Sequence, residues 1–346
     1  MTDIKLSIII PVLNDAVVLT RLLEQISSQR FDGLELVVAD GGSHDHSVAV
    51  ARAAGVSVVE SPPGRGRQMN AAAQVAQGQQ WLFLHADSWL PHPGFLQDAY
   101  ACMSRQLAIQ PRSAGHFPLQ FIDVPPGRGW MWRFWEEKTR FNRPECIHGD
   151  QGLWISRSFF QELGGFDTTY PFLEERHVTR EVAQRGQWLL LPGYLGTSAR
   201  RFVREGLARR AVLNALIMTC HELGHHDFLQ SAPALYREQA ATGLLPMAAF
   251  FRLLLMLDHA VPKHIRRQRW RAAGVLLRQS LWQVFLFMDV VSRGTVLPTR
   301  GYFLAFYNRF LDPLLPWLLP DFLAEWCAWL LFHGVRLGFQ WGKEVP

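Results

Sequence analysis

The sequence has little cysteine and few charged residues. Four of its 346 residues are Cys, spaced far apart with no Cys-x-x-Cys pair, and charged residues make up 19% of the chain. This spacing excludes a disulfide framework and is typical of reduced, buried thiols in a cytoplasmic protein. Hydrophobic residues, at 49%, exclude a disordered chain.

Long hydrophobic runs without charge or proline are also missing. Two apolar stretches stand out: 244–261 contains Arg252 and Asp258, and 313–335 contains two acidic residues and two internal prolines. A membrane-spanning helix needs about 20 consecutive apolar residues with few charges. We therefore expect neither stretch to cross a membrane, and we see no signal peptide before the first predicted strand.

Charge is unevenly distributed along the chain. Residues 1–199 hold 17 Lys and Arg against 20 Asp and Glu, a net charge of −3, whereas residues 200–346 hold 18 against 10, a net charge of +8. The chain is also rich in Trp, with 13, and in Phe, with 23. Together with the length, this split predicts two parts with different tasks.

The first part alternates strand and helix patterns. Aliphatic and β-branched residues predict strands, and apolar residues at helical spacing predict the helices between them. The strands are expected at 5–12, 34–39, 56–59 and 80–84, and the helices at 17–26, 47–54 and from 66 to about 76. This order predicts an α/β fold, a mostly parallel, Rossmann-like sheet with helices on both faces.

The alternation fades after about residue 113. One strand is expected over 115–122, a polar helix over 174–185 and a long helix over 202–223. From about residue 231 onward the pattern is helical, apolar and basic.

Polar residues follow each of the four predicted strands. Asn14, Asp40, the loop 62–67 and Asp87 all stand where a strand ends. In parallel sheets, ligands bind beyond the carboxyl ends of the strands. The sequence therefore predicts a ligand site at this edge.

Two of these segments suit a nucleoside diphosphate. Arg65 and Arg67 stand at a helix N-terminus, where free N–H groups and positive charge bind anions. Asp40 precedes Gly41, which allows close approach of a ligand, and its carboxylate could accept hydrogen bonds from a base or ribose. The alternatives are a solvated basic loop and an ordinary tight turn. Asp87 offers carboxylate oxygens to Mg²⁺ or Mn²⁺.

The ordered set of motifs resembles a known family. Strand-Pro-x-x-Asn, then Asp-Gly-Gly-Ser-x-Asp, then a strand ending in x-Ala-Asp are similar to the nucleotide-sugar site of family 2 glycosyltransferases with the GT-A fold. More narrowly, Gly-Arg-Gly-Arg-Gln-Met-Asn at 64–70, Leu-His-Ala-Asp-Ser at 84–88, Gly-Asp-Gln-Gly at 149–152 and Thr-Ser-Ala-Arg-Arg at 197–201 resemble a small bacterial subgroup, the radical-SAM/selenodomain-associated transferase 2 proteins. The resemblance covers roughly residues 4–225.

The resemblance implies roles for single residues. Asp40 would contact the nucleoside, Arg65 and Arg67 the diphosphate, and Asp87 a divalent metal on the sugar-diphosphate. The remaining residues that these motifs assign to substrate binding are Pro11, Asn14, Gly41, Asn70, Gln151, Arg200 and Arg201.

The same resemblance implies a catalytic base. The family usually has Glu-Asp where this chain has Glu174-Glu175, so Glu175 takes the place of the base, with Glu174 and Asp150 as alternatives. Inverting sugar transfer needs such a carboxylate to accept the proton of the attacking acceptor. It also needs positive charge on the departing diphosphate.

A competing motif points to a different class of enzyme. His221, Glu222 and His225 match His-Glu-x-x-His, the helical zinc signature of metalloproteases. This motif makes a zinc metallohydrolase the alternative hypothesis. A non-catalytic protein that binds nucleotide sugars, or a membrane adaptor, is a third.

The C-terminal part combines basic and aromatic residues. A basic run over 263–271 lies between apolar helical segments, and Trp317, Trp326, Trp329 and Trp341 follow. These residues favour association with an anionic membrane surface over nucleic acid, and a lipid-linked acceptor at the inner face of the cell membrane would then be in reach. The alternative is a packed helical appendage. We predict a glycosyltransferase domain over 1–229 and a helical extension over 230–346.

Overall fold

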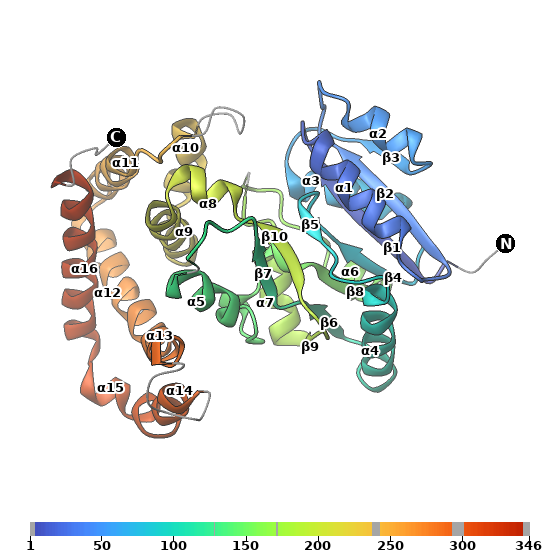
Figure 1. Cartoon of the computed structure of the whole chain (residues 1–346). Helices are drawn as coiled ribbons and strands as arrows, with labels where there is room; N and C mark the ends of the chain where they lie inside the picture. Colours follow the sequence, from blue (N-terminus) through green and yellow to red (C-terminus); the bar gives the residue numbers. More distant parts are fainter. Residues whose placement is uncertain (1–3, 128, 171, 237–242, 293–300, 342–346) are drawn as a thin grey trace. The chain divides into compact units, whose positions relative to one another are not determined.

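The chain is described by a computed structural model that covers residues 4–127, 129–170, 172–236, 243–292 and 301–341 (Figure 1). It divides into two compact units, residues 1–124 with 131–199, and residues 125–130 with 200–346. Each unit is described by itself.

A seven-stranded sheet organises the first unit, in the order β3-β2-β1-β4-β8-β6-β9. Neighbours pair in parallel except β8, which runs antiparallel to β4 and β6. The mostly parallel sheet predicted from the sequence is therefore confirmed. The strands are β1 (Leu6–Val12), β2 (Leu34–Asp40), β3 (Ser57–Glu60), β4 (Gln80–Phe83), β6 (Ser113–His116), β8 (Leu153–Ser156) and β9 (Gln187–Leu190).

Helices cover both faces of this sheet because successive strand residues point to opposite sides. Ile8 and Ile10 of β1 pack in one hydrophobic cluster with helices α1 (Ala16–Ser27) and α4 (Phe95–Ile109). Ile9, between them, belongs to a second cluster. The helices of that second cluster are α3 (Arg65–Val75), α6 (Arg157–Glu162) and α7 (Glu175–Arg185).

The strand predicted over 115–122 is two strands in different sheets. β6 ends at His116, and β7 (Leu119–Ile122) begins a three-stranded sheet with β10 (Leu195–Ser198) and β5 (Ser88–Trp89). Pro118 lies between β6 and β7 and has no N–H to continue a ladder. The single-strand prediction was wrong because residue composition does not show which partners a strand pairs with.

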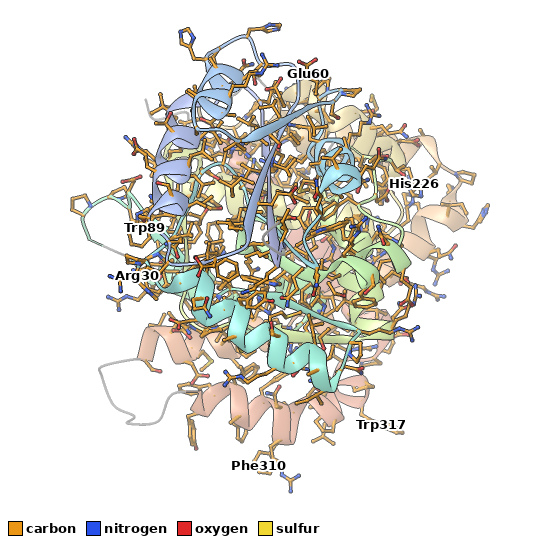
Figure 2. The ribbon with its side chains drawn as sticks, turned by 90° about the vertical axis from the view of Figure 1, so that its right-hand side faces the viewer. Arg30, Glu60, Trp89, His226, Phe310 and Trp317 are labelled. Carbon is orange, nitrogen blue, oxygen red and sulfur yellow. The ribbon has the colours of Figure 1, made fainter. Side chains whose placement is uncertain are left out.

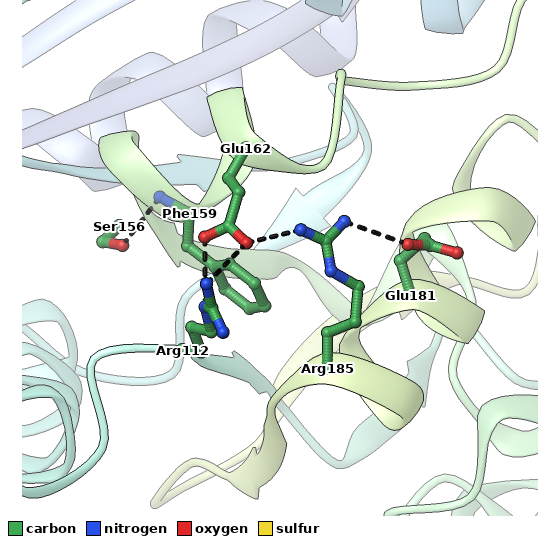
Figure 3. Close-up of polar contacts among 6 residues, drawn as sticks. All are labelled: Arg112, Ser156, Phe159, Glu162, Glu181 and Arg185. Atoms are coloured by element: carbon green, nitrogen blue, oxygen red, sulfur yellow. Dashed lines mark hydrogen bonds and ion pairs between the residues drawn. The ribbon is translucent and has the colours of Figure 1, made fainter.

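An ion-pair network fixes the far end of α7 (Figure 3). Glu162, the last residue of α6, accepts from both Arg112 and Arg185, and Arg185 also donates to Glu181 at 3.2 Å. These groups are partly exposed, so each pair contributes at most about 1 kcal/mol. Together they hold α7 against α6 and the start of β6.

The second unit is helical. Its helices are α8 (Arg200–Glu205), α9 (Leu207–Glu222), α10 (His226–Ser231), α11 (Met247–Ala260), α12 (Lys263–Gln279), α13 (Trp282–Ser292), α14 (Tyr302–Phe306), α15 (Leu315–Leu318) and α16 (Asp321–Trp341). The helix predicted over 202–223 is broken at Gly206, whose φ of 84° is left-handed. Because α9 packs on α8, α10 and α11, the compact units divide at residue 199, while the domain boundary near 229 stays a prediction.

Within the described ranges, one helical stretch meets the length and composition of a membrane span. It is Lys263–Ser292, where α12 and α13 join, and it differs from both stretches considered in the sequence. The pair Tyr302–Leu318 and Asp321–Gln340 meets the same test only if it is one span, and it is bent by 98°. The break falls beside Pro320, which confirms that proline interrupts the apolar run over 313–335.

The ends of β1 and β2 are tied by one buried amide. Gln68 of α3 donates from Nε2 to the carbonyl oxygens of Val12 and Ala39, both at 2.8 Å. A methyl group at Gly41 would lie 3.0 Å from the Gln68 side chain, so glycine makes room for this amide.

We expect Gln68→Met to lower the free energy of unfolding by about 2–3 kcal/mol, because it leaves two carbonyls without this donor at nearly constant volume. Urea denaturation measures the change. The matched control is Gln74→Met, an exposed position on the same helix, with a change within about 0.5 kcal/mol. Equal losses of unfolding free energy in the two variants would contradict the role of the Gln68 amide in joining β1 to β2.

Candidate functional site

An open pocket lies at the carboxyl ends of β2 and β3. It encloses about 520 Å³ and is lined by Asp40, Gly42, Ser43, Val48, Glu60, Ser61 and Pro62. The Oδ2 atom of Asp40 accepts from the N–H groups of Gly42 at 2.9 Å and Ser43 at 3.0 Å. Its Oδ1 atom is buried and has no hydrogen-bond partner within the described part of the chain. Asp40 therefore holds an acceptor ready for a ligand's donor group.

Asn14 shapes the rim of this pocket. Its φ of 52° is left-handed, a conformation that Asn adopts more readily than most residues. The side-chain oxygen accepts from His44 N–H at 2.7 Å, and its own N–H donates to Ser43 Oγ at 2.9 Å. The predicted substrate-binding residue thus holds the turn that follows Asp40.

The start of α3 packs closely on the loop that precedes α7. A methyl group at Gly66 would lie 3.0 Å from both the Asp167 carbonyl oxygen and Glu174 Cβ. Arg65 places a guanidinium nitrogen 4.0 Å from Glu174 Oε1, and much of its side chain remains exposed. Arg67 is exposed as well. Both arginines are therefore accessible to an anion beside this helix end.

A second polar cluster gathers after β4. A methyl group at Gly149 would lie 3.0 Å from His85 Nε2 and 4.0 Å from Glu175 Oε2, so these three residues converge. His148 Nδ1 is 3.9 Å from Glu175 Oε1. Together with Glu174, these residues line a small cavity of about 20 Å³, room for one water molecule.

Burial and neighbouring charge push two pKa values of this cluster apart. Burial raises the pKa of Asp150, and the charges of Asp87 and Glu175 add to that, while His148 opposes it. Burial also acts to raise the pKa of Glu175, but its interactions with His148 outweigh it and hold that pKa below the usual range. Glu175 is thus the ionised carboxylate of the pair and Asp150 the more readily protonated one.

Glu174 differs from its neighbour. It is buried at the N-terminal end of α7, and burial, followed by the charge of Glu175, raises its pKa to about 7 against the opposing charge of Arg65. Its Oε1 atom lies 4.0 Å from an Arg65 guanidinium nitrogen, so Glu174 also helps to hold Arg65 in place.

Two predicted substrate-binding amides are engaged with the protein itself. Asn70 donates to the Phe166 carbonyl oxygen and accepts from its N–H, both at 2.9 Å. Gln151 is fully buried; it donates to the Cys146 carbonyl oxygen at 2.5 Å and its Oε1 lies 2.9 Å from His116 Nδ1. In the structure both amides bond within the protein and position the loops that carry the carboxylates, and their contact with substrate stays a prediction.

Four further predictions have varied outcomes. Pro11 is buried inside β1 opposite Ala39, and Gly41 makes room for the Gln68 side chain. Both residues therefore contribute through the course of the backbone and not through a side chain that reaches a ligand. Arg200 and Arg201 begin α8 in the second unit, and their contact with substrate stays a prediction.

Sequence reasoning missed three residues of this region. Glu60 and Ser61 line the Asp40 pocket, and the end of the predicted strand 56–59 was the signal that could have found them. His148 was not among the predicted site residues, although its interactions with Glu175 lower the pKa of that carboxyl.

The zinc hypothesis needs His221 and His225 one turn apart on one helix. Instead α9 ends at Glu222, Gly224 has a left-handed φ of 67°, and His225 precedes α10. Across the described ranges, no group of three or more His, Cys, Asp or Glu could hold a metal ion. The helical zinc motif that the metallohydrolase hypothesis requires is therefore not formed.

The same finding bears on Asp87. The described residues form no three-ligand cage around it, so a cation here must share its coordination with oxygens of a bound molecule. Mg²⁺ and Mn²⁺ suit this arrangement, because they take one or two carboxylates together with substrate phosphates. The buried Oδ1 atom of Asp150 has no hydrogen-bond partner among the described residues, and Asp150 senses the charge of Asp87, which fits a nearby cation.

Comparisons with known proteins agree with this geometry. The family model described as Glycosyl transferase family 2 matches residues 7–164. Proteins of Mycobacterium tuberculosis and Mycobacterium bovis named PGL/p-HBAD biosynthesis glycosyltransferase are 37% identical over 181 residues, which cover 49% of this chain and 66% of theirs, just under two thirds.

Two solved structures are also similar. S. aureus TarS 1–349 in complex with UDP has a TM-score of 0.50 at 15% identity, over 99% of this chain and 93% of that one. The mannosyltransferase PcManGT from Pyrobaculum calidifontis, in complex with GDP-Man and Mn²⁺, has a TM-score of 0.47 at 20% identity, over 99% and 90%. The likeness to TarS shows the fold, and the sheet is of the GT-A type.

We expect Glu174→Gln to stabilise the protein at pH 8 and to leave it nearly unchanged at pH 5. The unfolded chain ionises Glu174 near pH 4.5, whereas the folded protein keeps the proton until about pH 7, so stability falls as the pH rises between these values. The substitution removes this loss, about 3 kcal/mol at pH 8. Urea denaturation at the two pH values measures it, with Glu181→Gln as control. A difference independent of pH would contradict the assignment.

Proposed function

We propose, from the chain's membership of glycosyltransferase family 2 through residues 7–164, that it transfers a sugar from a nucleoside-diphosphate donor to an acceptor hydroxyl. One observation carries the proposal: a nucleotide-sized pocket and a carboxylate cluster lie at the same edge of one sheet. The pocket follows β2, and the cluster follows β4, two strands that run parallel to β1 on either side of it.

The donor is held from two sides in this proposal. Asp40 accepts hydrogen bonds from the nucleoside through Oδ1, beside the glycines of the turn. Arg65 and Arg67 at the start of α3 balance the charge of the diphosphate, helped by the free N–H groups of the helix end. Asp87, with Asp150 near it, would hold Mg²⁺ or Mn²⁺ against the diphosphate oxygens. When bound, the cation stabilises the negative charge of the leaving group.

Glu175 is the base in an inverting displacement. The acceptor oxygen attacks the anomeric carbon as the bond from that carbon to the diphosphate oxygen breaks, and the hydroxyl proton passes to the Glu175 carboxylate. The electron pair of the broken bond leaves with the nucleoside diphosphate. The low pKa of Glu175 supports this choice, because the group is ionised before each turnover. Asp150 and Glu174 have raised pKa values and remain the alternatives, because a carboxylate with a raised pKa is the stronger base once it is ionised.

We also propose that the acceptor is lipid-linked and is met at an anionic membrane surface on the cytoplasmic side. The basic residues of α12 and the exposed Trp317, Trp326 and Trp329 support this. The side chain of Trp341 lies outside the described residues. Basic residues beside interfacial Trp suit anionic headgroups.

We expect Glu175→Gln to lower the rate of sugar transfer by at least 100-fold while the donor still binds, because the amide cannot accept the proton. UDP-, GDP- and TDP-sugars with Mn²⁺ are first screened by thermal shift, and transfer or slow donor hydrolysis is then followed. Asp87→Ala should lose the Mn²⁺-dependent part of the shift. Glu181→Gln, on the same helix, is the control and should keep full activity.

Three results would count against this assignment. Activity that survives Glu175→Gln refutes the base. No stabilisation by any of the three donors refutes the nucleotide-sugar site. Binding without turnover in the unmodified protein would favour the non-catalytic alternative.

We expect His148→Ala to move the acidic limb of the pH–rate profile to higher pH. Glu175 must be ionised to act, so the rate falls as the pH drops through its pKa. Without His148, burial dominates and that pKa rises above its usual value. His92→Ala, an exposed position, should leave the profile in place, and an unmoved limb in His148→Ala would contradict the pairing.

A further inference from the structure

We infer that the bent pair of helical segments Tyr302–Leu318 and Asp321–Gln340 is a membrane-insertion element, which enters one leaflet of an anionic bilayer without crossing it. The inference rests on the proposed association with a membrane surface. It adds which segment enters the lipid and how deep it lies. It depends only on contacts within the second unit.

The burial pattern of helix α16 is the reverse of that expected for a helix of a soluble protein. Its small residues Ala324 and Ala328 are buried, whereas Phe322 and Trp326 are 61% and 60% exposed. The buried side faces Gly274 of α12, where an added methyl group would lie 2.4 Å from the Glu325 backbone nitrogen. Close backbone approach through small residues, with large apolar side chains turned outward, is the packing of helices in lipid.

The apolar surface continues around the bend. Trp317 is 86% exposed, and Phe310 and Trp317 both project away from the ribbon (Figure 2). The other large apolar side chains exposed here are Tyr302, Phe306, Leu314, Leu318, Leu323, Trp329, Leu330, Leu331 and Leu337. Contiguous apolar surface of this kind marks an interaction site and is not expected to face water.

The acidic residues of α16 are neutralised by arginines of α12. Asp321 pairs with Arg278 at 2.7 Å, and Glu325 with Arg271 at 3.5 Å. Pairing lowers the cost of bringing these carboxylates near lipid. These contacts leave no excess negative charge at this end of α16 to repel an anionic surface.

The basic side chains lie at a definite level relative to the bend. Helices α12 and α16 run antiparallel, because Arg278 meets the start of α16 while Trp270 contacts Phe332 edge to face and stacks against His333. From Phe322 to His333 the helix rises roughly 17 Å at about 1.5 Å per residue. One leaflet of hydrocarbon is about 15 Å thick, half of the bilayer core. The exposed Lys263 and Arg267 lie beyond this point, at the level of the lipid headgroups.

Charge and geometry favour a bilayer over other occupants. Lys263 and Arg267 form a basic belt about one leaflet's thickness from the apolar residues at the bend, and this spacing matches an anionic membrane. The 98° bend sets the two segments nearly at right angles, so the pair does not form one straight span. A second copy of this chain would bring one basic belt against another.

The test uses the full chain and a probe that the structure supplies. Cys327 on α16 is exposed, Cys146 and Cys220 are buried, and Cys102→Ser removes the remaining partly exposed thiol. An environment-sensitive fluorophore on Cys327 is mixed with vesicles of phosphatidylcholine alone or with 30% phosphatidylglycerol. We expect a blue shift with the anionic vesicles that persists when 1 M NaCl is added after binding.

Variants separate insertion from other contacts. Trp317→Asp with Phe322→Asp should lower the vesicle-bound fraction at least tenfold in flotation. Ile109→Asp, an equally exposed apolar position in the first unit, should not change it. Lys263→Glu with Arg267→Glu should abolish the preference for anionic vesicles.

Each contrary outcome overturns the inference. Binding that 1 M NaCl reverses completely would mean electrostatic contact without insertion. A blue shift without vesicles, together with a doubled mass in solution, would mean that a second copy covers the face. Donor binding by the Trp317 and Phe322 variant is measured in parallel, and vesicle binding by Glu175→Gln, so a failed insertion and a failed transferase assignment remain distinguishable.

Discussion

The proposed chemistry depends on the burial of three carboxyl groups beside one another. Asp150, Glu174 and Glu175 share one end of the sheet, and burial alone would raise the pKa of each. Ionised carboxylates so close would repel, and each of the three has a different neighbour that relieves this: His148 beside Glu175, Arg65 beside Glu174, and in the proposal a divalent ion beside Asp150. The different roles proposed for the three carboxyl groups follow from these different neighbours.

Buried amides hold this unfavourable arrangement in place. Gln68 ties β1 to β2, Asn70 clamps the backbone at Phe166, and Gln151 joins Cys146 to His116. Gln68 and Asn70 satisfy backbone groups of segments far away in the chain, whereas Gln151 bonds a carbonyl five residues before it and the ring of His116. These bonds cost little because donor and acceptor are both desolvated and paired. The carboxylates can therefore be kept close together without relying on one another for position.

The candidate residues could be picked out from the sequence, because Asp40 and Asp87 follow strands and the resemblance pointed to Glu175; their roles in binding and catalysis stay predictions. The bonds that Asn70 and Gln151 make within the protein could not be predicted, since an amide that binds substrate and one that binds backbone look alike in sequence. Asn70 bonds a residue 96 positions away, and no local pattern reports that distance. Gly206 and Gly224 can be read from the sequence, but continuous helix was predicted at Gly206 and required by the zinc motif at Gly224. In the structure each of these glycines ends a helix.

The two units solve the burial of apolar surface in opposite ways. In the first, large side chains such as Trp81 and Trp154 are buried and charged groups lie outside, as water requires. On α16 Ala324 and Ala328 are buried, whereas Trp326 and Trp329 are exposed. Hydropathy averages cannot separate the two cases, because they count apolar residues without saying which way they face. The close approach of the two backbones at Gly274 shows that the side of α16 with the small residues packs on α12. The opposite side, with the large apolar residues, is left to face lipid.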